Sequence, residues 1–266
     1  MIFNLKYCIK YVKIKLMIKF HKRRISVMTL NDVIFKRKST RSYAQLPVDE
    51  GTLYEIKEYI EKLHPLNENI RTYCEIVPAK DVKGGVKAPY FAAIYSEKTE
   101  GYLTEVGFRY QQLDLYLQSI GLGSCWCADA KYAPNGTVVP TYNGMPLVIM
   151  IGFGKAKDSP YRNISEFRRK ERRDISDSPD MRLEPARLAP SSYNDQPWYF
   201  LKDGRFFHAY CVIQGFLKAK HADTNLIDMG IAMAQMYTAN PDTFRYFVNK
   251  DPAQVKGYKY IGSFKI

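Results

Sequence analysis

The sequence predicts an α+β fold assembled from two tandem, related halves. Helical stretches with apolar periodicity alternate with strand-like runs on both sides of a basic connection. Several positions of the first half also recur in the second at a nearly constant spacing. They are Pro65 with Pro190 and Asn69 with Asn194, both 125 residues apart, and Gly107 with Gly230, 123 residues apart. Such recurrence indicates a degenerate internal repeat. We therefore divide the chain into an N-terminal extension (1–27), a first half (28–160), a basic connection (161–179) and a shorter second half (180–266).

The first half begins with a short helix, which Thr29 is placed to cap. An extended piece to Pro47 precedes a helix over Asp49–Leu63, whose apolar residues share one face. The remaining expected elements are strands at Thr72–Val77 and Tyr90–Tyr95, a long helix over Gly101–Ile120 that ends at a Gly-Leu-Gly-Ser turn, and a buried strand at Leu147–Phe153. Residues 155–180 are expected to form a surface connection.

The second half is expected to repeat the alternation in shorter form. A helix over Asp180–Leu188 comes first, and Pro185 can kink it. The elements expected after it are strands at Trp198–Leu201 and Arg205–Ile213 and an apolar helix at Asn225–Thr238.

Charge is distributed unevenly along the chain. The 266 residues are 46% hydrophobic, enough for a substantial core, and the net charge is +13. Residues 1–27 hold eight Lys and Arg and no acid, which leaves +5 for the rest. No RNA-binding or helix-turn-helix motif is visible. A nucleic-acid or membrane-surface module is therefore the lower-ranked alternative, and we expect neither nucleic acid nor membrane as a partner.

The N-terminal extension is apolar but interrupted by Lys every two to four residues. It lacks a run near the roughly 20 residues of a membrane helix, and it lacks a signal-peptide pattern. We expect it to be disordered or to be upstream read-through, with Met28 as the natural start. A basic helix lying on a membrane surface is the alternative.

Five cysteines without metal-ligand or CxxC spacing favour a reduced, cytoplasmic protein. The segment Cys125-Trp126-Cys127 is either a redox-active pair or, as we favour, a pair of small buried side chains. The four histidines are not paired with acids at helical spacing, and no metal site is expected.

Two polar stretches carry the functional signal. Residues 189–200, APSSYNDQPWYF, join a helix-ending turn to the start of a strand through several hydrogen-bonding side chains. A polar loop that merely caps the strand is the simpler interpretation. Residues 35–43, FKRKSTRSY, gather Arg37, Lys38, Ser39 and Arg41, which suit a phosphate and an electron-rich ring.

The pair of motifs resembles the nitroreductase family of FMN-dependent oxidoreductases, whose chains carry RRSxRxF-like and APSxxNxQPW-like segments. The resemblance covers most of residues 28–266. It implies a nitroreductase-like fold in which each half has a mixed β-sheet flanked by helices. Family members are typically homodimers with FMN at the interface, but here the first motif survives only in the first half and the second only in the second half. The chain thus resembles a tandem branch in which one chain mimics the dimer, and one FMN per chain is expected between the halves.

The resemblance also implies roles for individual residues. Arg41 would stabilise the reduced flavin, and Arg37, Lys38 and Ser39 would bind the phosphate and ribityl end. Pro190, Ser191, Ser192 and Asn194 would contact the ring edge or the ribityl hydroxyls from the other half. The turn Gly121, Leu122, Gly123 and Ser124 would offer a backbone N–H toward the ring, although such a turn also ends a helix. Arg168 and Arg169 would reach the phosphate, or they belong to a solvated basic run.

The implied function is NAD(P)H-dependent, ping-pong hydride transfer through flavin N5 to an electron-poor nitroaromatic or quinone. No acid, base or nucleophile is expected, because the cofactor carries the chemistry. Tyr193, Trp198 and Tyr199 either line a stacking surface for the acceptor or belong to the core. The alternative function is a flavin-binding carrier or sensor without turnover. The expected assembly is a monomeric pseudo-dimer or a weak homo-oligomer.

Overall fold

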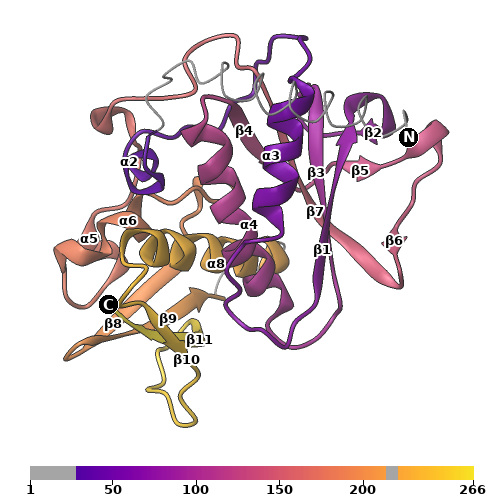
Figure 1. The fold of residues 1–266 in the computed structure, drawn as a ribbon. Coiled ribbons are helices and arrows are strands. Elements are labelled where there is room, and N and C mark those ends of the chain that lie inside the picture. The colour runs from indigo at the N-terminus through magenta and orange to yellow at the C-terminus, as the bar shows by residue number, and fades with distance from the viewer. Residues whose placement is uncertain (1–27, 214–220) are drawn as a thin grey trace, which may run out of the picture.

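The computed structural model describes residues 28–213 and 221–266. The predicted basic extension, residues 1–27, lies outside the described residues. Two antiparallel sheets occupy opposite sides of the molecule, and long helices pack together between them (Figure 1).

The first half follows the predicted order and adds short strands. Thr29 caps α2 (Leu30–Ile34) through a hydrogen bond from the Asp32 N–H to Thr29 Oγ1 of 3.1 Å, and Asp49 caps α3 (Glu50–Ile60). The remaining elements are β1 (Thr72–Pro78), β2 (Val82–Lys83), β3 (Tyr90–Ser96), α4 (Tyr102–Ser119), β4 (Gly123–Cys127), β5 (Lys131–Tyr132), β6 (Thr141–Tyr142) and β7 (Met145–Gly154). Strands β1, β3, β7 and β4 form the main sheet in that order.

The basic connection is less exposed than the sequence suggested. Its short helix α5 (Arg172–Ile175) ends in Ile175, which is fully buried, and the next residue, Ser176, bridges Phe200. The expectation of a surface connection is therefore wrong for these two residues. The physical reason is that a single large aliphatic side chain in a basic run anchors the run to the core.

The second half contains α6 (Glu184–Leu188), β8 (Trp198–Asp203), β9 (Phe206–Val212), α8 (Ala222–Ala239), β10 (Arg245–Phe247) and β11 (Tyr258–Lys265). Pro185 does not kink a longer helix. It stands in the first turn of α6, after a separate 3₁₀ turn at Met181–Leu183, where a missing N–H costs nothing. The sheet order is β8, β9, β11, β10.

The two sheets have the same connectivity. In each, the first two strands pair, a long helix follows, and the last of the sheet's four strands enters between the second and the third. Every pairing between named strands is antiparallel. Parallel pairing is confined, within the described residues, to isolated bridges between Ser39 and Ser124 and between Ser176 and Phe200.

Helices α4 and α8 cross at two glycines. A Cβ on Gly107 would overlap the carbonyl of Ile227, and a Cβ on Gly230 would overlap the carbonyl of Thr104. These two contacts are reciprocal, because Gly107 and Thr104 lie 123 residues before Gly230 and Ile227. Glycine is needed at both positions because two backbones meet there.

Candidate functional site between the halves

A cavity of about 450 Å³ lies between the two halves. One wall comes from the segment after α2 and from β4, and the other comes from the loop before β8 and from α8. The lining residues are Ser39, Arg41, Gly85, Val86, Cys125, Trp126, Cys127, Ala128, Asp129, Ile149, Pro190, Ser191, Ser192, Tyr193, Thr224, Ile227, Asp228 and Ile231.

Five of the residues that the sequence predicted to bind the cofactor line this cavity. Ser39 and Arg41 come from the first motif, and Pro190, Ser191 and Ser192 come from the second. The two motifs stand about 150 positions apart in the printed sequence, and the fold places them on one cavity. Of the three aromatic candidates, Tyr193 is at the cavity with 80% of its side chain exposed, whereas Trp198 is buried in the core. Tyr199 does not line the cavity.

Arg37, two residues before Ser39, belongs to a buried polar network. Its Nε is 3.0 Å from Oδ2 of Asp114 on α4, and both side chains are almost completely buried. Ser124 Oγ donates to the other oxygen, Asp114 Oδ1, over 2.7 Å. The ion pair and these hydrogen bonds compensate the burial of the carboxylate. The side chains of Arg37 and Ser124 thus fix the position of the wall that carries Ser39.

The turn after α4 supports the cavity without lining it. Gly121 has a left-handed φ of 83° and ends the helix, and Leu122 is half-buried. A Cβ on Gly123 would lie 2.5 Å from Thr40 Oγ1, so glycine lets β4 pass close to the first motif. The Lys38 N–H meets Gln118 Oε1 of α4 at 3.3 Å. The cavity wall itself is formed by the next residues, Cys125–Asp129.

The loop before β8 contains several left-handed residues and is held by hydrogen bonds. Tyr193, Asn194 and Gln196 all have left-handed φ values, of 52°, 60° and 48°. The Ser192 N–H donates to Asp228 Oδ2 on α8 over 3.0 Å, and the Gln196 N–H donates to Ser191 Oγ over 2.9 Å. Left-handed conformations in non-glycine residues are costly and concentrate at binding sites.

Arg162 and Arg169 lie near this loop, where they repel each other and the arginines of the first motif, Arg37 and Arg41. Arg169 donates to the carbonyl of Ala189 and, over 2.6 Å, to Asn194 Oδ1. Burial, then repulsion from Arg37 and Arg162, lowers the pKa of Arg169 to about 10. Burial, then repulsion from Arg37 and Arg41, lowers the pKa of Arg162. Like charges gathered this closely favour an anion.

Arg162 is the member of this cluster that sequence analysis missed. The backbone N–H of Arg162 donates a hydrogen bond to the backbone carbonyl of Lys36 over 2.7 Å, which places Arg162 beside the first motif. Its Nε is buried and has no hydrogen-bond partner among the described residues. Arg168, which the sequence predicted to reach the phosphate, has an exposed side chain, and its backbone carbonyl accepts a hydrogen bond from Asn194 Nδ2.

The residues of α8 at the cavity were also missed. Asp228 could have been found from the repeat, because it lies 123 residues after Glu105. Gly85 and Val86 gave no sequence signal beyond a turn.

Among the described residues, no group of His, Cys, Asp and Glu side chains is arranged to bind a metal ion. None of the described helices has the length and apolar character that crossing a bilayer requires.

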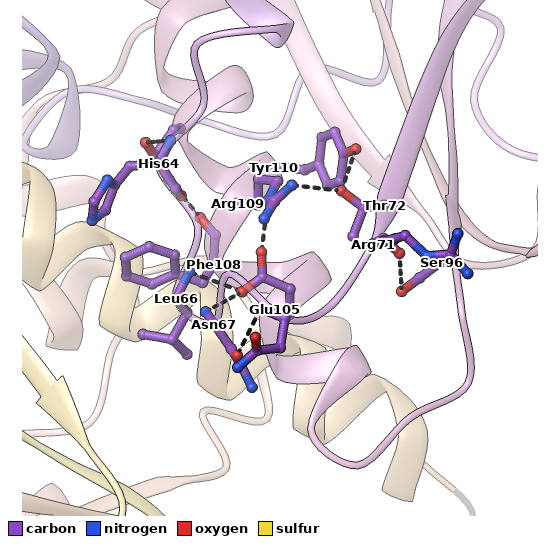
Figure 2. Close-up of polar contacts among 12 residues, drawn as sticks. His64, Leu66, Asn67, Arg71, Thr72, Ser96, Glu105, Phe108, Arg109 and Tyr110 are labelled. Atoms are coloured by element: carbon purple, nitrogen blue, oxygen red, sulfur yellow. Dashed lines mark hydrogen bonds and ion pairs between the residues drawn. The ribbon is translucent and has the colours of Figure 1, made fainter.

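A second cavity, of about 620 Å³, lies at the corresponding place on the other side of the α4–α8 pair. Its loop is held by Glu105, whose Oε2 accepts the N–H groups of Leu66 and Asn67 over 2.8 Å each (Figure 2). Arg109 pairs with the other oxygen of Glu105. Among the described residues that line this cavity, Lys259 carries the only positive charge.

Comparison with known families decides the classification. Residues 29–240 match the family described as "Putative TM nitroreductase". The chain belongs to this nitroreductase family.

The chain is also similar to several solved structures. A structure described as a "putative nitroreductase" from Thermotoga maritima matches with a TM-score of 0.60 and 17% identity, covering 90% of this chain and 93% of that chain. A nitroreductase with bound FMN from Desulfitobacterium hafniense matches with a TM-score of 0.40 and 15% identity, covering 50% of this chain and 92% of that one. An FMN-dependent nitroreductase from Clostridium difficile matches with a TM-score of 0.39 and 18% identity, covering 51% and 93%. The comparison with curated proteins finds no match.

Proposed function

We propose that this chain is an FMN-dependent NAD(P)H oxidoreductase of the nitroreductase type, with one FMN in the cavity between the halves. The observation that carries the proposal is the meeting of Ser39 and Arg41 with Pro190, Ser191 and Ser192 on one cavity, beside a cluster of arginines. Such a site offers a polar loop, backbone N–H groups and concentrated positive charge.

The arginine cluster fits the phosphate of FMN. Arg162 has a buried Nε without a hydrogen-bond partner among the described residues, and burial, then repulsion between the arginines, lowers the pKa values of Arg162 and Arg169. A phosphate would accept hydrogen bonds from these guanidinium groups and relieve their repulsion. Arg162 and Arg169 would thus bind the phosphate, supported by Arg37 and Lys38, while Arg168 would contribute only its charge at longer range.

The cavity walls fit the ring and the ribityl chain. Ser39, Ser191 and Ser192 offer hydrogen-bonding groups from opposite halves, with Asn194 holding Arg169 in place. Arg41 would stabilise the negative charge that reduction places on the ring. When bound, FMN would supply two-electron hydride transfer between NAD(P)H and a nitroaromatic or quinone acceptor. Tyr193 would cover the mouth of the cavity on the acceptor side.

The single site is explained by a fused dimer. The equal strand orders and the reciprocal contacts of Gly107 and Gly230 support two related halves arranged as a pseudo-dimer. Among the described residues that line the second cavity, none is an arginine that could bind a phosphate. The proposal includes a monomer or weak homo-oligomer, a cytoplasmic location, and neither nucleic acid nor membrane as partner.

A flavin-binding carrier or sensor is the alternative. It shares the binding site but not turnover, so steady-state oxidation of NADH or NADPH with a generic quinone separates the two. Turnover that depends on both substrates supports the enzyme. Tight flavin binding without turnover supports the carrier.

The first test is the flavin content of the purified full-length chain after incubation with FMN. We expect about one FMN per chain. Two per chain would contradict the single site, and none would contradict the proposal. In the loaded protein, Arg41→Ala should make the flavin harder to reduce, whereas Arg205→Ala, an exposed change outside the cavity, should leave the reduction potential unchanged. An unchanged potential in Arg41→Ala would remove Arg41 from this role.

A further inference from the structure

The apolar part of the cavity between the halves contains an aromatic side chain that the proposed function does not use. Trp126 of β4 lines this cavity and is half-buried. Three isoleucines also line it, Ile149 of β7 and Ile227 and Ile231 of α8, and each is at most 6% exposed. All four side chains belong to the same hydrophobic cluster. A ligand in the cavity therefore meets an indole set among aliphatic side chains.

The sequence predicted a stacking surface at other aromatic residues. Trp198 is 2% exposed in the core, and neither Trp198 nor Tyr199 lines the cavity. Trp126 was missed because it stands between two cysteines just after a helix-ending turn. Those cysteines, Cys125 and Cys127, are each 4% exposed, as expected for small buried side chains. Because alternate residues of a strand face opposite sides of the sheet, the side chain of Trp126 lies on the other side, toward α4.

A buried chain of hydrogen bonds fixes the orientation of the indole. Trp126 Nε1 donates to Gln111 Oε1 on α4 over 3.0 Å, and Gln111 Nε2 donates to Asp114 Oδ2 over 3.0 Å. Both Gln111 and Asp114 are completely buried, and Asp114 also pairs with Arg37. The ionised carboxylate only accepts hydrogen bonds, so the amide NH₂ of Gln111 must face Asp114. The amide oxygen is thus left to accept the indole N–H.

The cavity meets the carbon atoms of the indole and not its N–H. Gln111 does not line the cavity, so the N–H edge of Trp126 is directed away from a ligand. The face of an indole carries partial negative charge and attracts the face of an electron-poor ring in an offset stack. Ser39 and Ser191 line the same cavity and can hydrogen-bond heteroatoms at the edge of such a ring. The lining therefore suits a flat, electron-poor aromatic ring.

We infer that Trp126 is the contact surface for a flat, electron-poor aromatic ring, and that Gln111 is a positioning residue that holds the indole for this contact. The source of the ring rests on the proposed function, because both the ring of FMN and the aromatic acceptor have this chemistry. The contact itself does not depend on FMN, so it can be tested without the cofactor.

The first test adds 1,3-dinitrobenzene to the full-length chain after removal of any flavin and records tryptophan fluorescence. An electron-poor nitroaromatic quenches an excited indole at contact, so we expect saturable quenching of the wild type. The sequence contains two tryptophans, and Trp198 is buried in the core, so Trp126→Phe should abolish the saturable part. Quenching of the wild type that never saturates, or saturable quenching that persists in Trp126→Phe, would overturn the inference. A protein that binds no FMN would defeat the proposed function but leave this test intact.

The second test identifies the source of the ring by comparing FMN with riboflavin, which lacks the phosphate. If the ring is that of FMN, Trp126→Leu should weaken the binding of both flavins about 2- to 10-fold and preserve the ratio of their dissociation constants. Arg162→Ala is the control, because it should weaken FMN alone. If the ring is that of the acceptor, Trp126→Leu should instead weaken the binding of dinitrobenzene to the FMN-loaded protein by the same factor. Unchanged binding of all three ligands would contradict the role of Trp126.

A double-mutant cycle tests the positioning role of Gln111. Gln111→Met keeps the length of the side chain but removes its hydrogen bonds, so it should weaken the binding of dinitrobenzene about 2- to 5-fold, as measured by equilibrium dialysis. In Trp126→Phe, which has no N–H, the same change should have no effect. Equal effects in the two backgrounds would show that Gln111 acts only on the stability of the fold. Since the quenching is measured on the wild type, the inference stays testable if a variant fails to fold.

Discussion

The two loops at the centre of the molecule have the same anchor but different chemistry. The Ser192 N–H binds the carboxylate of Asp228, and the Asn67 N–H binds that of Glu105, at positions related by the offsets of the repeat. Yet the loop before β8 contains left-handed non-glycine residues and lies beside the arginine cluster, whereas the loop before β1 has neither. The difference teaches that the helix-to-loop anchor belongs to the shared fold, whereas the left-handed residues and the gathered charge set the loop before β8 apart.

One pair of equivalent positions shows how the first loop changed. Gln196 is buried, and its side chain accepts the Lys170 N–H over 2.7 Å, which ties the loop to the basic connection. The corresponding Arg71 is exposed and pairs with Glu97 over 2.9 Å. An ion pair on the surface contributes little stability. The equivalent position of the first loop thus pairs with the residue directly after β3 and not with the basic connection.

The largest expected effect tests the shared framework. Gly107→Ala and Gly230→Ala each place a methyl group against a backbone carbonyl of the opposite helix, so each should lower the free energy of unfolding by at least about 2 kcal/mol. The reciprocal geometry predicts similar losses. Urea denaturation measures them. Gly51→Ala on α3 is the control, because there the new methyl group meets only a side-chain oxygen at 3.3 Å and helix propensity favours alanine. A large loss of unfolding free energy at only one of the two glycines would contradict the equivalence of the two helix contacts.

The next effect separates the two cavities by their charge. Arg162→Ala should weaken FMN binding about 10- to 100-fold, because charge-assisted hydrogen bonds contribute roughly 1.5–3 kcal/mol. Lys259→Ala, which removes the positive charge lining the second cavity, should change the affinity less than about twofold. Fluorescence titration of the flavin measures both. Equal losses in the two variants would contradict the assignment of the site to the first cavity.

Much of the fold was predictable because local signals agreed with burial. The predicted helix at 101–120 matches α4 within one residue at each end, since Gly101 and Gly121 have left-handed φ values that bound it. The strand β4 was missed because GSCWC directly follows a glycine turn and lacks alternation. Strand β11 was missed because Lys259 and Gly262 interrupt it, the latter beside a bulge.

The candidate site was predictable where its signal lay in one loop. Ser39, Arg41 and the 190–192 segment were found because polar residues cluster locally there and because the two motifs resemble those of the nitroreductase family. The partner of Arg37 could not be found, because Asp114 is 77 residues away and only folding brings them together. Arg162 lies in the predicted basic connection, but it was missed because only folding brings it to the Lys36 carbonyl beside the first motif.

The carboxylate that anchors the first loop predicts a pH dependence. Burial raises the pKa of Glu105 above its usual value, although Arg109 and the N–H groups of Asn67 and Leu66 oppose this rise. The folded state therefore binds a proton on Glu105 more tightly than the unfolded state does. Protonation of Glu105 thus stabilises the folded state at pH values below about 4.5, and this stabilisation is lost as the pH rises through the pKa of Glu105 in the folded state. Relative to Glu105→Gln, the wild type should lose unfolding free energy over this window, by at most about 1.4 kcal/mol per pH unit. Denaturation curves recorded from pH 4 upward measure it, and a constant difference between the two proteins would contradict the shift.

The smallest effect distinguishes the backbones of the two loops. Tyr193 has a φ of 52° and is 80% exposed, so Tyr193→Gly relieves left-handed strain while losing little packing beyond the ring of His221. It should raise the free energy of unfolding by up to about 1 kcal/mol, since such strain costs roughly 1–2 kcal/mol. Glu68 is its counterpart in the first loop and has no left-handed φ, so Glu68→Gly should lower stability by about 0.5–1 kcal/mol through the greater freedom of the unfolded chain. Opposite signs in thermal denaturation would locate the strain in the loop of the proposed FMN site, and a loss of stability in both variants would show that Tyr193 is held by contacts that outweigh its backbone conformation.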